Sequence, residues 1–151
     1  MMAAVKNKKL PFEAAFARLK TVCERKKIRL TPLRAAVWEC LWRANAPVGA
    51  YDLIDDLKRA ARPAPPVSVY RVLDFWIKNG VVHRLERENA YVLCAFPDEK
   101  HTPVLAVCSV CGRLEEFKSE KVAKEIKKSV KKFKIKEVSV RVDGICADCR
   151  H

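Results

Sequence analysis

The fold of the first half of this chain is decided by residues 66–94, which read PVSVYRVLDFWIKNGVVHRLERENAYVLC. Apolar side chains recur on one helical face of 66–79, at Val69, Leu73, Trp76 and Ile77. Gly80 suits the position just after a helix. Residues 81–87 and 90–94 then alternate as two strands joined by a tight turn. A helix followed by such a hairpin predicts the recognition helix and wing of a winged helix-turn-helix.

Amphipathic segments upstream supply the other helices that this fold needs. Residues 11–27 carry apolar side chains at helical spacing, and Thr31-Pro32 resembles an N-cap followed by a first-turn proline. A second helix then ends near Ala44, and a third is centred on 53–57. Three or four short helices before a hairpin complete the predicted winged helix.

The solvent face of the helix at 66–79 is the candidate DNA-reading surface. Arg71 points away from the apolar stripe, and Ser68 and Tyr70 lie close by. Arginine can bond guanine with two hydrogen bonds, whereas serine and tyrosine more often contact phosphate. The alternative is an ordinary solvated helix face. The basic N-terminal residues and the wing favour DNA binding.

Charge is spread unevenly over the 151 residues, whose net charge is +13. Residues 1–35 hold ten Lys/Arg against two acids, whereas 36–100 hold nine of each and 101–151 hold twelve against seven. A basic arm indicates a polyanionic partner, nucleic acid ahead of a membrane surface. No stretch approaches the roughly 18 apolar residues of a membrane span. Residues 1–10 lack the apolar run of a signal peptide, so we expect a cytoplasmic protein.

Two CxxC pairs mark the last third of the chain, Cys108-Ser-Val-Cys111 and Cys146-Ala-Asp-Cys149. Four thiolates arranged in two such turns suit a tetrahedral structural zinc site. The 34 residues from Gly112 to Ile145 leave room for a helix and a strand between the pairs. We therefore expect the metal to join two ends of a small α/β domain; disulfides or free thiols are the alternatives.

The domain boundaries follow from composition. The polar, proline-flanked segment 95–103 reads as a hinge between a winged-helix domain at 1–94 and an α/β domain at 104–151. Strands are predicted at 104–108, 114–117 and 138–142, and a Ser119-capped helix at 119–133. The lysines coating that helix are interpreted as a solvated face, ahead of a second DNA contact. The predicted fold class is α+β.

A second metal constellation is predicted around the hinge. His83 and Cys94 lie on the two wing strands, whose antiparallel pairing can bring them close, and His101 lies in the hinge. Either Glu115 or Glu116 could complete the set. A thiolate, two imidazoles and a carboxylate suit a divalent metal, and the sulfur favours Zn over Fe(II) or Mn(II). The alternative is that these residues are simply packed; Cys23 and Cys40, on apolar helix faces, are interpreted as core.

The ordered motifs resemble those of the ferric uptake regulator superfamily, and within it the zinc uptake regulators. They are Arg29-Leu-Thr-Pro-Leu-Arg34, Ser68-Val-Tyr-Arg-Val-Leu73, Tyr91-Val-Leu-Cys94, His101-Thr and Cys108-x-x-Cys-Gly112 with Cys146-x-x-Cys149. The resemblance implies a homodimer with a C-terminal dimerisation domain that represses genes when metal is bound. It implies two Zn²⁺ sites per protomer and DNA contacts from Tyr70 and Arg71. The structural site would be Cys108, Cys111, Cys146 and Cys149, and the regulatory site His83, Cys94, His101 and Glu116.

The resemblance leaves rival functions. The iron-sensing branch typically has a His-His-x-His cluster before the first CxxC, where this chain has only His101. Iron, manganese or peroxide sensing on the same fold remains the alternative to a zinc-dependent repressor of zinc-uptake genes. A metal enzyme would need an open water position, which a fourth ligand at Glu116 closes. We therefore predict no enzyme activity and no small-molecule substrate, but a double-stranded operator bound by one dimer or by two.

Overall fold

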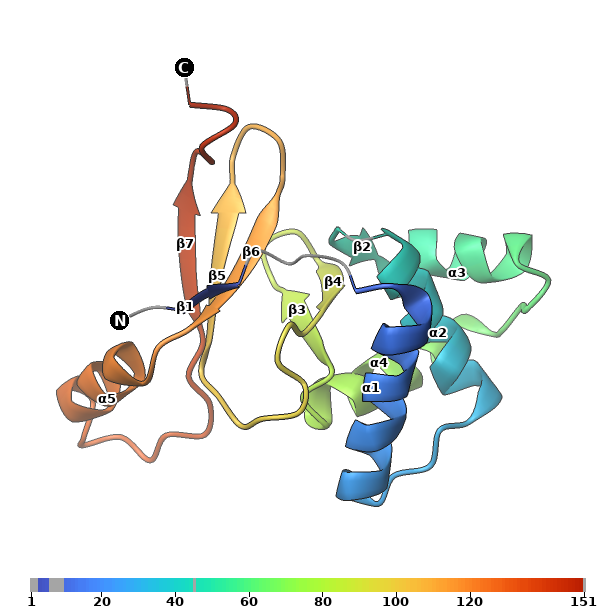
Figure 1. The fold of residues 1–151 in the computed structure, drawn as a ribbon, viewed down its shortest axis with the longest axis horizontal. Helices are drawn as coiled ribbons and strands as arrows, with labels where there is room; N and C mark the ends of the chain where they lie inside the picture. Colours follow the sequence, from blue (N-terminus) through green and yellow to red (C-terminus); the bar gives the residue numbers. More distant parts are fainter. Residues whose placement is uncertain (1–2, 6–9, 45, 151) are drawn as a thin grey trace. The chain divides into compact units, whose positions relative to one another are not determined.

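The computed structural model describes residues 3–5, 10–44 and 46–150, and the chain divides into two compact units (Figure 1). The first unit comprises residues 9–98, and the second comprises 99–151 together with the N-terminal strand. Each unit has its own β-sheet. The predicted hinge at 95–103 spans the division between them. No helix in the described residues is long and apolar enough to cross a membrane.

The first unit is a winged helix-turn-helix, as the sequence predicts. Its helices precede a short hairpin, in the order α1 (Phe12–Lys26), α2 (Pro32–Ala44), α3 (Ala50–Arg59), α4 (Pro66–Lys78), β3 (Val82–Leu85) and β4 (Ala90–Leu93). A two-residue strand, β2 (Val48–Gly49), pairs with β4, which gives an antiparallel sheet of order β2-β4-β3. The hairpin formed by β3 and β4 is the wing.

Local chemistry explains where these helices begin and end. The Thr31 hydroxyl accepts a hydrogen bond from the Arg34 N–H at 3.3 Å, which makes it the predicted cap of α2. Pro66 occupies the first turn of α4, where its missing N–H has no partner to lose. Gly80 lies between α4 and β3 and has a φ of 74°, a left-handed conformation that glycine adopts without strain.

Helix α4 is fixed by the core of the first unit. Val69, Leu73 and Trp76, three members of the predicted apolar stripe, are fully buried, and Ile77 is half-buried. The Trp76 indole N–H also donates to the Arg34 carbonyl at 3.2 Å. Burying such side chains contributes roughly 1.5–3 kcal/mol each. The orientation of α4, and so of its solvent face, is therefore set by packing.

The second unit is a four-stranded sheet with one helix. Its elements are β1 (Ala3–Val5), β5 (Pro103–Cys108), β6 (Leu114–Lys118), α5 (Glu120–Ser129) and β7 (Val140–Gly144). The strand order is β1-β6-β5-β7, in which β5 and β7 run parallel and the other pairs antiparallel. The pairing of β1 with β6 groups β1 with this unit, whereas the sequence predicted a first domain that comprises residues 1–94.

Two boundaries in the second unit differ from the sequence prediction. Ser119 caps α5 as expected, accepting from the Val122 N–H at 3.3 Å, but the helix ends at Ser129 instead of 133. Lysines spaced four apart in 127–132 would repel one another on a longer helix. Phe133 is 75% exposed and does not join the core stripe. Strand β7 begins at Val140, two residues later than predicted.

Candidate metal centres and nucleic-acid interface

The two CxxC pairs meet at one end of the second unit. Strand β5 ends at Cys108, and its parallel register pairs that residue with Gly144 at the end of β7. Cys146 and Cys149 follow immediately along the chain. Sulfur atoms of the four cysteines all lie within 4.8 Å of one another. The register between β5 and β7 therefore closes the long gap between the motifs and forms a four-cysteine cluster.

The chemistry of this cluster fits a zinc ion. The Cys146 N–H donates to the Cys108 sulfur at 3.3 Å, and this bond, with one from the Cys111 N–H, lowers the pKa of Cys108 to about 6. Hydrogen bonds with the sulfurs of Cys146 and Cys111 raise the pKa of Cys149 to about 12. The Cys111 and Cys146 sulfurs are 3.7 Å apart, beyond disulfide length. The lowered pKa of one cysteine and the raised pKa of another show that the cluster does not favour four thiolates by itself, whereas a bound dication would stabilise all four as thiolates.

A buried carboxylate forms the core of the second ligand set in this unit. Glu116, on β6, is 0% exposed, and its Oε1 lies 2.8 Å from His101 Nε2. The other ring nitrogen, Nδ1, lies 3.0 Å from the Glu99 carbonyl oxygen. If Nδ1 donates to that carbonyl, Nε2 and the carboxylate face each other as two ligand atoms. Glu115, the other glutamate that the sequence offers as a ligand, is half-buried and points to the other side of β6.

The other two candidate ligands lie together in the wing of the first unit. Strands β3 and β4 pair antiparallel, and the Cys94 N–H continues the ladder by donating to the Val81 carbonyl at 2.8 Å. This pairing brings a His83 ring nitrogen within 4.8 Å of the Cys94 sulfur. The Phe96 N–H donates to that sulfur at 3.3 Å, which holds the Cys94 side chain in place. One sulfur and one nitrogen at this spacing form half of a ligand set for a divalent metal.

The candidate reading surface lies on α4, opposite its buried face. Tyr70 is 36% exposed, Arg71 is exposed, and Ser68 is half-buried. Arg71 forms no ion pair with any residue that the structure describes. Val67, 61% exposed, extends the surface towards the start of the helix. A guanidinium held on a rigid helix without a carboxylate partner can bond a base edge or a phosphate.

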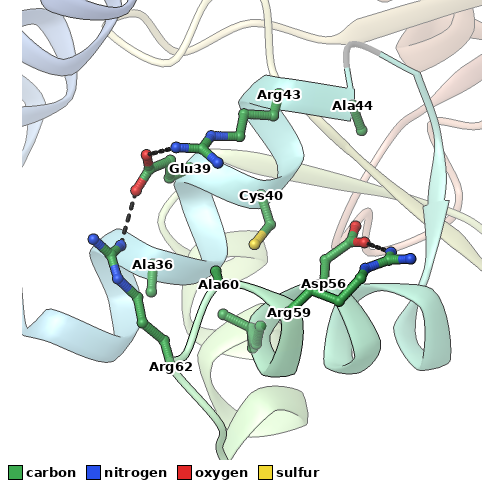
Figure 2. A pocket seen from close by; sticks show the side chains of 10 residues that line it. Ala36, Glu39, Cys40, Arg43, Ala44, Asp56, Arg59, Ala60 and Arg62 are labelled. Carbon is green, nitrogen blue, oxygen red and sulfur yellow. Dashed lines mark hydrogen bonds and ion pairs between the residues drawn. The ribbon is translucent and has the colours of Figure 1, made fainter.

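A pocket of about 520 Å³ lies between α2 and the end of α3, but its charged groups are already paired (Figure 2). Arg43 and Arg62 both bond Glu39, at 2.7 and 2.8 Å, and Arg59 pairs with Asp56. Burial is the main cause that raises the pKa of the Cys40 thiol in this pocket. Cys40 is therefore a protonated thiol outside the two ligand sets, as is Cys23, which is buried in the core with a raised pKa.

These features define a class of protein in which a winged helix is joined to a small α/β unit with a four-cysteine cluster. The profile of the Ferric uptake regulator family matches residues 25–143. The Zinc uptake regulation protein of Escherichia coli (strain K12) is 35% identical over 136 residues, which cover 88% of this chain and 80% of that protein. The chain belongs to the ferric uptake regulator family.

Solved structures agree with this assignment. A structure described as a zinc uptake regulator complexed with zinc and DNA is similar at a TM-score of 0.85 and 33% identity, covering 93% of this chain and 96% of that one. The crystal structure of holo XcZur is similar at a TM-score of 0.82 and 34% identity, covering 89% and 96%.

The sequence predicted the side chains of both candidate ligand sets but gave no sign of the backbone groups that contact them. The Glu99 carbonyl orients His101, and the Phe96 N–H bonds Cys94. Main-chain groups carry no residue-type signal, so only the folded chain reveals them. The structure brings together the four cysteines, His83 with Cys94, and His101 with Glu116.

Proposed function

We propose that this chain is a cytoplasmic, zinc-responsive transcriptional repressor that binds the operators of zinc-uptake genes as a homodimer. The observation that carries the proposal is the presence of two ligand pairs, sulfur with nitrogen in one unit and nitrogen with oxygen in the other. Family membership and relatives named for zinc uptake regulation support it. So does the similarity to a regulator solved with zinc and DNA.

Two zinc ions per protomer are proposed, with different roles. Cys108, Cys111, Cys146 and Cys149 would hold a structural ion that joins β5 to the chain after β7. A regulatory ion would be held by the first unit's pair, His83 and Cys94, and the second unit's pair, His101 and Glu116. An ion shared between the units would select one arrangement of the DNA reader, so that metal binding favours the operator-binding conformer.

Operator recognition is assigned to α4. Arg71 and Tyr70 would contact bases and phosphates, Ser68 a phosphate, and the basic residues of 1–35 would add salt-sensitive affinity. A two-fold dimer implies a pseudo-palindromic operator with half-sites about one helical turn, or a multiple of it, apart. Band stoichiometry on an isolated operator would distinguish one bound dimer from two.

The regulatory site is tested by Cys94→Ser, with Cys40→Ser as the matched control in the same unit. We expect Cys94→Ser to abolish zinc-dependent operator binding, because serine replaces a thiolate ligand, while the protein stays folded and dimeric. The measurement is operator gel shift against buffered free zinc. Cys40→Ser should behave as wild type. Wild-type zinc dependence in Cys94→Ser would contradict the assignment of the site.

An iron, manganese or peroxide sensor of the same family is the second candidate. The sulfur donor at Cys94 favours zinc, whereas the nitrogen and oxygen donors suit all of these metals. Anaerobic titration of operator binding with zinc, iron and manganese separates the candidates. Activation by zinc at the lowest free metal concentration supports the proposal, and stronger activation by iron or manganese contradicts it.

A further inference from the structure

A dense group of positive charge lies in the second unit, outside the DNA-reading unit. Residues 121–136 contain eight lysines and one acid, Glu125. These sixteen residues therefore carry a net charge of +7, more than half of the chain's +13. Residues 36–100, which include α4, are neutral overall. The proposed operator contact does not use this lysine cluster.

The lysine cluster forms a single face along α5 and continues beyond it. At 100° per residue, four lysines fall within an arc of about 120°, namely Lys121, Lys124, Lys127 and Lys128. The remaining four follow the end of the helix, and all eight side chains are exposed. The opposite arc holds Ala123, which is buried, and Val122 and Ile126, which are half-buried. Packing against the unit thus turns the charged face outward.

Interactions within the chain account for little of this charge. Among the described residues, Lys128 alone of the eight has an ion-pair partner, Glu125 at 3.5 Å. Lys127 and Lys128 lie in the last turn of α5, where a cation stabilises the helix dipole. The other six lysines have neither an ion-pair partner among the described residues nor a position in the last turn of α5. Like charges four residues apart on a helix also destabilise it. A polyanion would convert this repulsion into binding energy.

We propose that the lysine cluster is a second DNA-contact surface, which binds the phosphate backbone of a duplex without reading its sequence. Duplex DNA carries one charge per roughly 1.7 Å of axis, so the roughly 10 Å between Lys121 and Lys128 along the helix spans several phosphates. The choice of DNA among polyanions rests on the proposed function. An interfacial membrane helix would instead expose a broad apolar face, whereas on α5 Ala123 is buried and Val122 and Ile126 are half-buried. The exposed apolar side chains of the cluster, Phe133 and Ile135, lie beyond the helix and are outnumbered by its eight lysines.

The test uses the full, zinc-loaded chain and a short duplex of arbitrary sequence without an operator. Four lysines that neither pair with Glu125 nor lie in the last helical turn are neutralised together: Lys121→Gln, Lys124→Gln, Lys131→Gln and Lys132→Gln. The matched control changes the same four residues to arginine, which keeps the charge. Fluorescence anisotropy measures duplex affinity as a function of salt, and circular dichroism checks the fold.

The glutamine variant is expected to bind the duplex at least about tenfold more weakly at low salt. When salt rises from 50 to 200 mM, wild type should lose up to about 100-fold more duplex affinity than the glutamine variant, because the variant makes four fewer phosphate contacts. The arginine variant should match wild type. Duplex affinity within about twofold of wild type in the glutamine variant overturns the proposal. Lysine-dependent binding that is tighter to polyglutamate or anionic vesicles than to DNA also overturns it.

The outcome is separable from that of the proposed function. Operator binding against free zinc is measured on the same variants. Operator binding by wild type that does not depend on zinc contradicts the repressor proposal. The lysine-dependent affinity for an arbitrary duplex then still stands as an independent result.

Discussion

The two units of this chain differ in what stabilises each of them. The first unit contains a continuous hydrophobic core to which all four helices and the wing contribute, with Leu53, Leu57 and Trp76 fully removed from solvent. The second unit buries few apolar side chains, mainly Val104, Leu105, Leu114 and Ala123. It also leaves large apolar side chains in solvent, including Phe133 at 75% and Val142 at 48% exposure.

The difference shows where the second unit must obtain its stability. A unit of about 60 residues buries only about 60% of the surface that its unfolded chain exposes and is marginally stable by packing alone, so a metal or a partner chain adds stability that it needs. The four-cysteine cluster supplies a metal site, and a second copy in the proposed dimer would cover exposed apolar side chains. The first unit needs neither. Metal removal and core substitution should therefore affect different units.

The largest effect is expected from Cys108→Ser. Structural zinc sites contribute on the order of 10 kcal/mol of apparent folding free energy, so the second unit should unfold and the dimer dissociate. Trp38, Trp42 and Trp76, the three tryptophans of the chain, all lie in the first unit, and their fluorescence reports that unit alone. We expect an unchanged fluorescence unfolding transition, with loss of bound zinc and of the dimer in sedimentation. A retained dimer with full zinc content would contradict the structural role.

Trp76→Ala should have the next largest effect, and in the opposite unit. Removing a fully buried tryptophan that also bonds the Arg34 carbonyl should lower the free energy of unfolding of the first unit by about 3–5 kcal/mol. Urea unfolding followed by the remaining tryptophans measures this, while the zinc content of the four-cysteine site should stay the same. Tyr51→Ala, at a 78% exposed position of the same unit, is the control. A loss below about 1 kcal/mol would show that the α4 packing is not essential.

The smallest effect is expected at the exposed ion pair between Arg18 and Asp98, 2.6 Å apart within the first unit. Burial opposes ionisation of Asp98, but the hydrogen bond and charge of Arg18 outweigh it and lower the pKa. The pair's contribution is therefore present above the unfolded pKa and is lost as pH falls through the lowered folded value. Arg18→Ala should cost under about 1 kcal/mol at neutral pH, because solvent screens the pair. Urea unfolding at neutral and acidic pH should show the difference between variant and wild type disappear in acid.

Sequence patterns predicted features that depend on neighbouring residues. The apolar period and Gly80 defined α4 and the wing, and Thr31 and Ser119 identified two helix starts. Patterns failed where local signals conflict, as in 127–132, where lysines four residues apart oppose the helix that the apolar spacing favours. The end of α5 could not be read from Val130 and Phe133, whose apolar spacing favoured a longer helix than the structure contains.

The sequence by itself determined the order of elements and the family and predicted the ligand types, because helix periodicity, turn residues and CxxC spacing are local properties of the chain. The tertiary structure decided which groups meet. The parallel register of β5 and β7 closes the four-cysteine cluster, and strand pairing turns Glu116, rather than Glu115, towards His101. The same holds for the lysine cluster, whose composition is visible in the sequence but whose exposure follows from the packing of Ala123. Contacts between residues far apart in the chain depend on register and burial, which no single segment specifies.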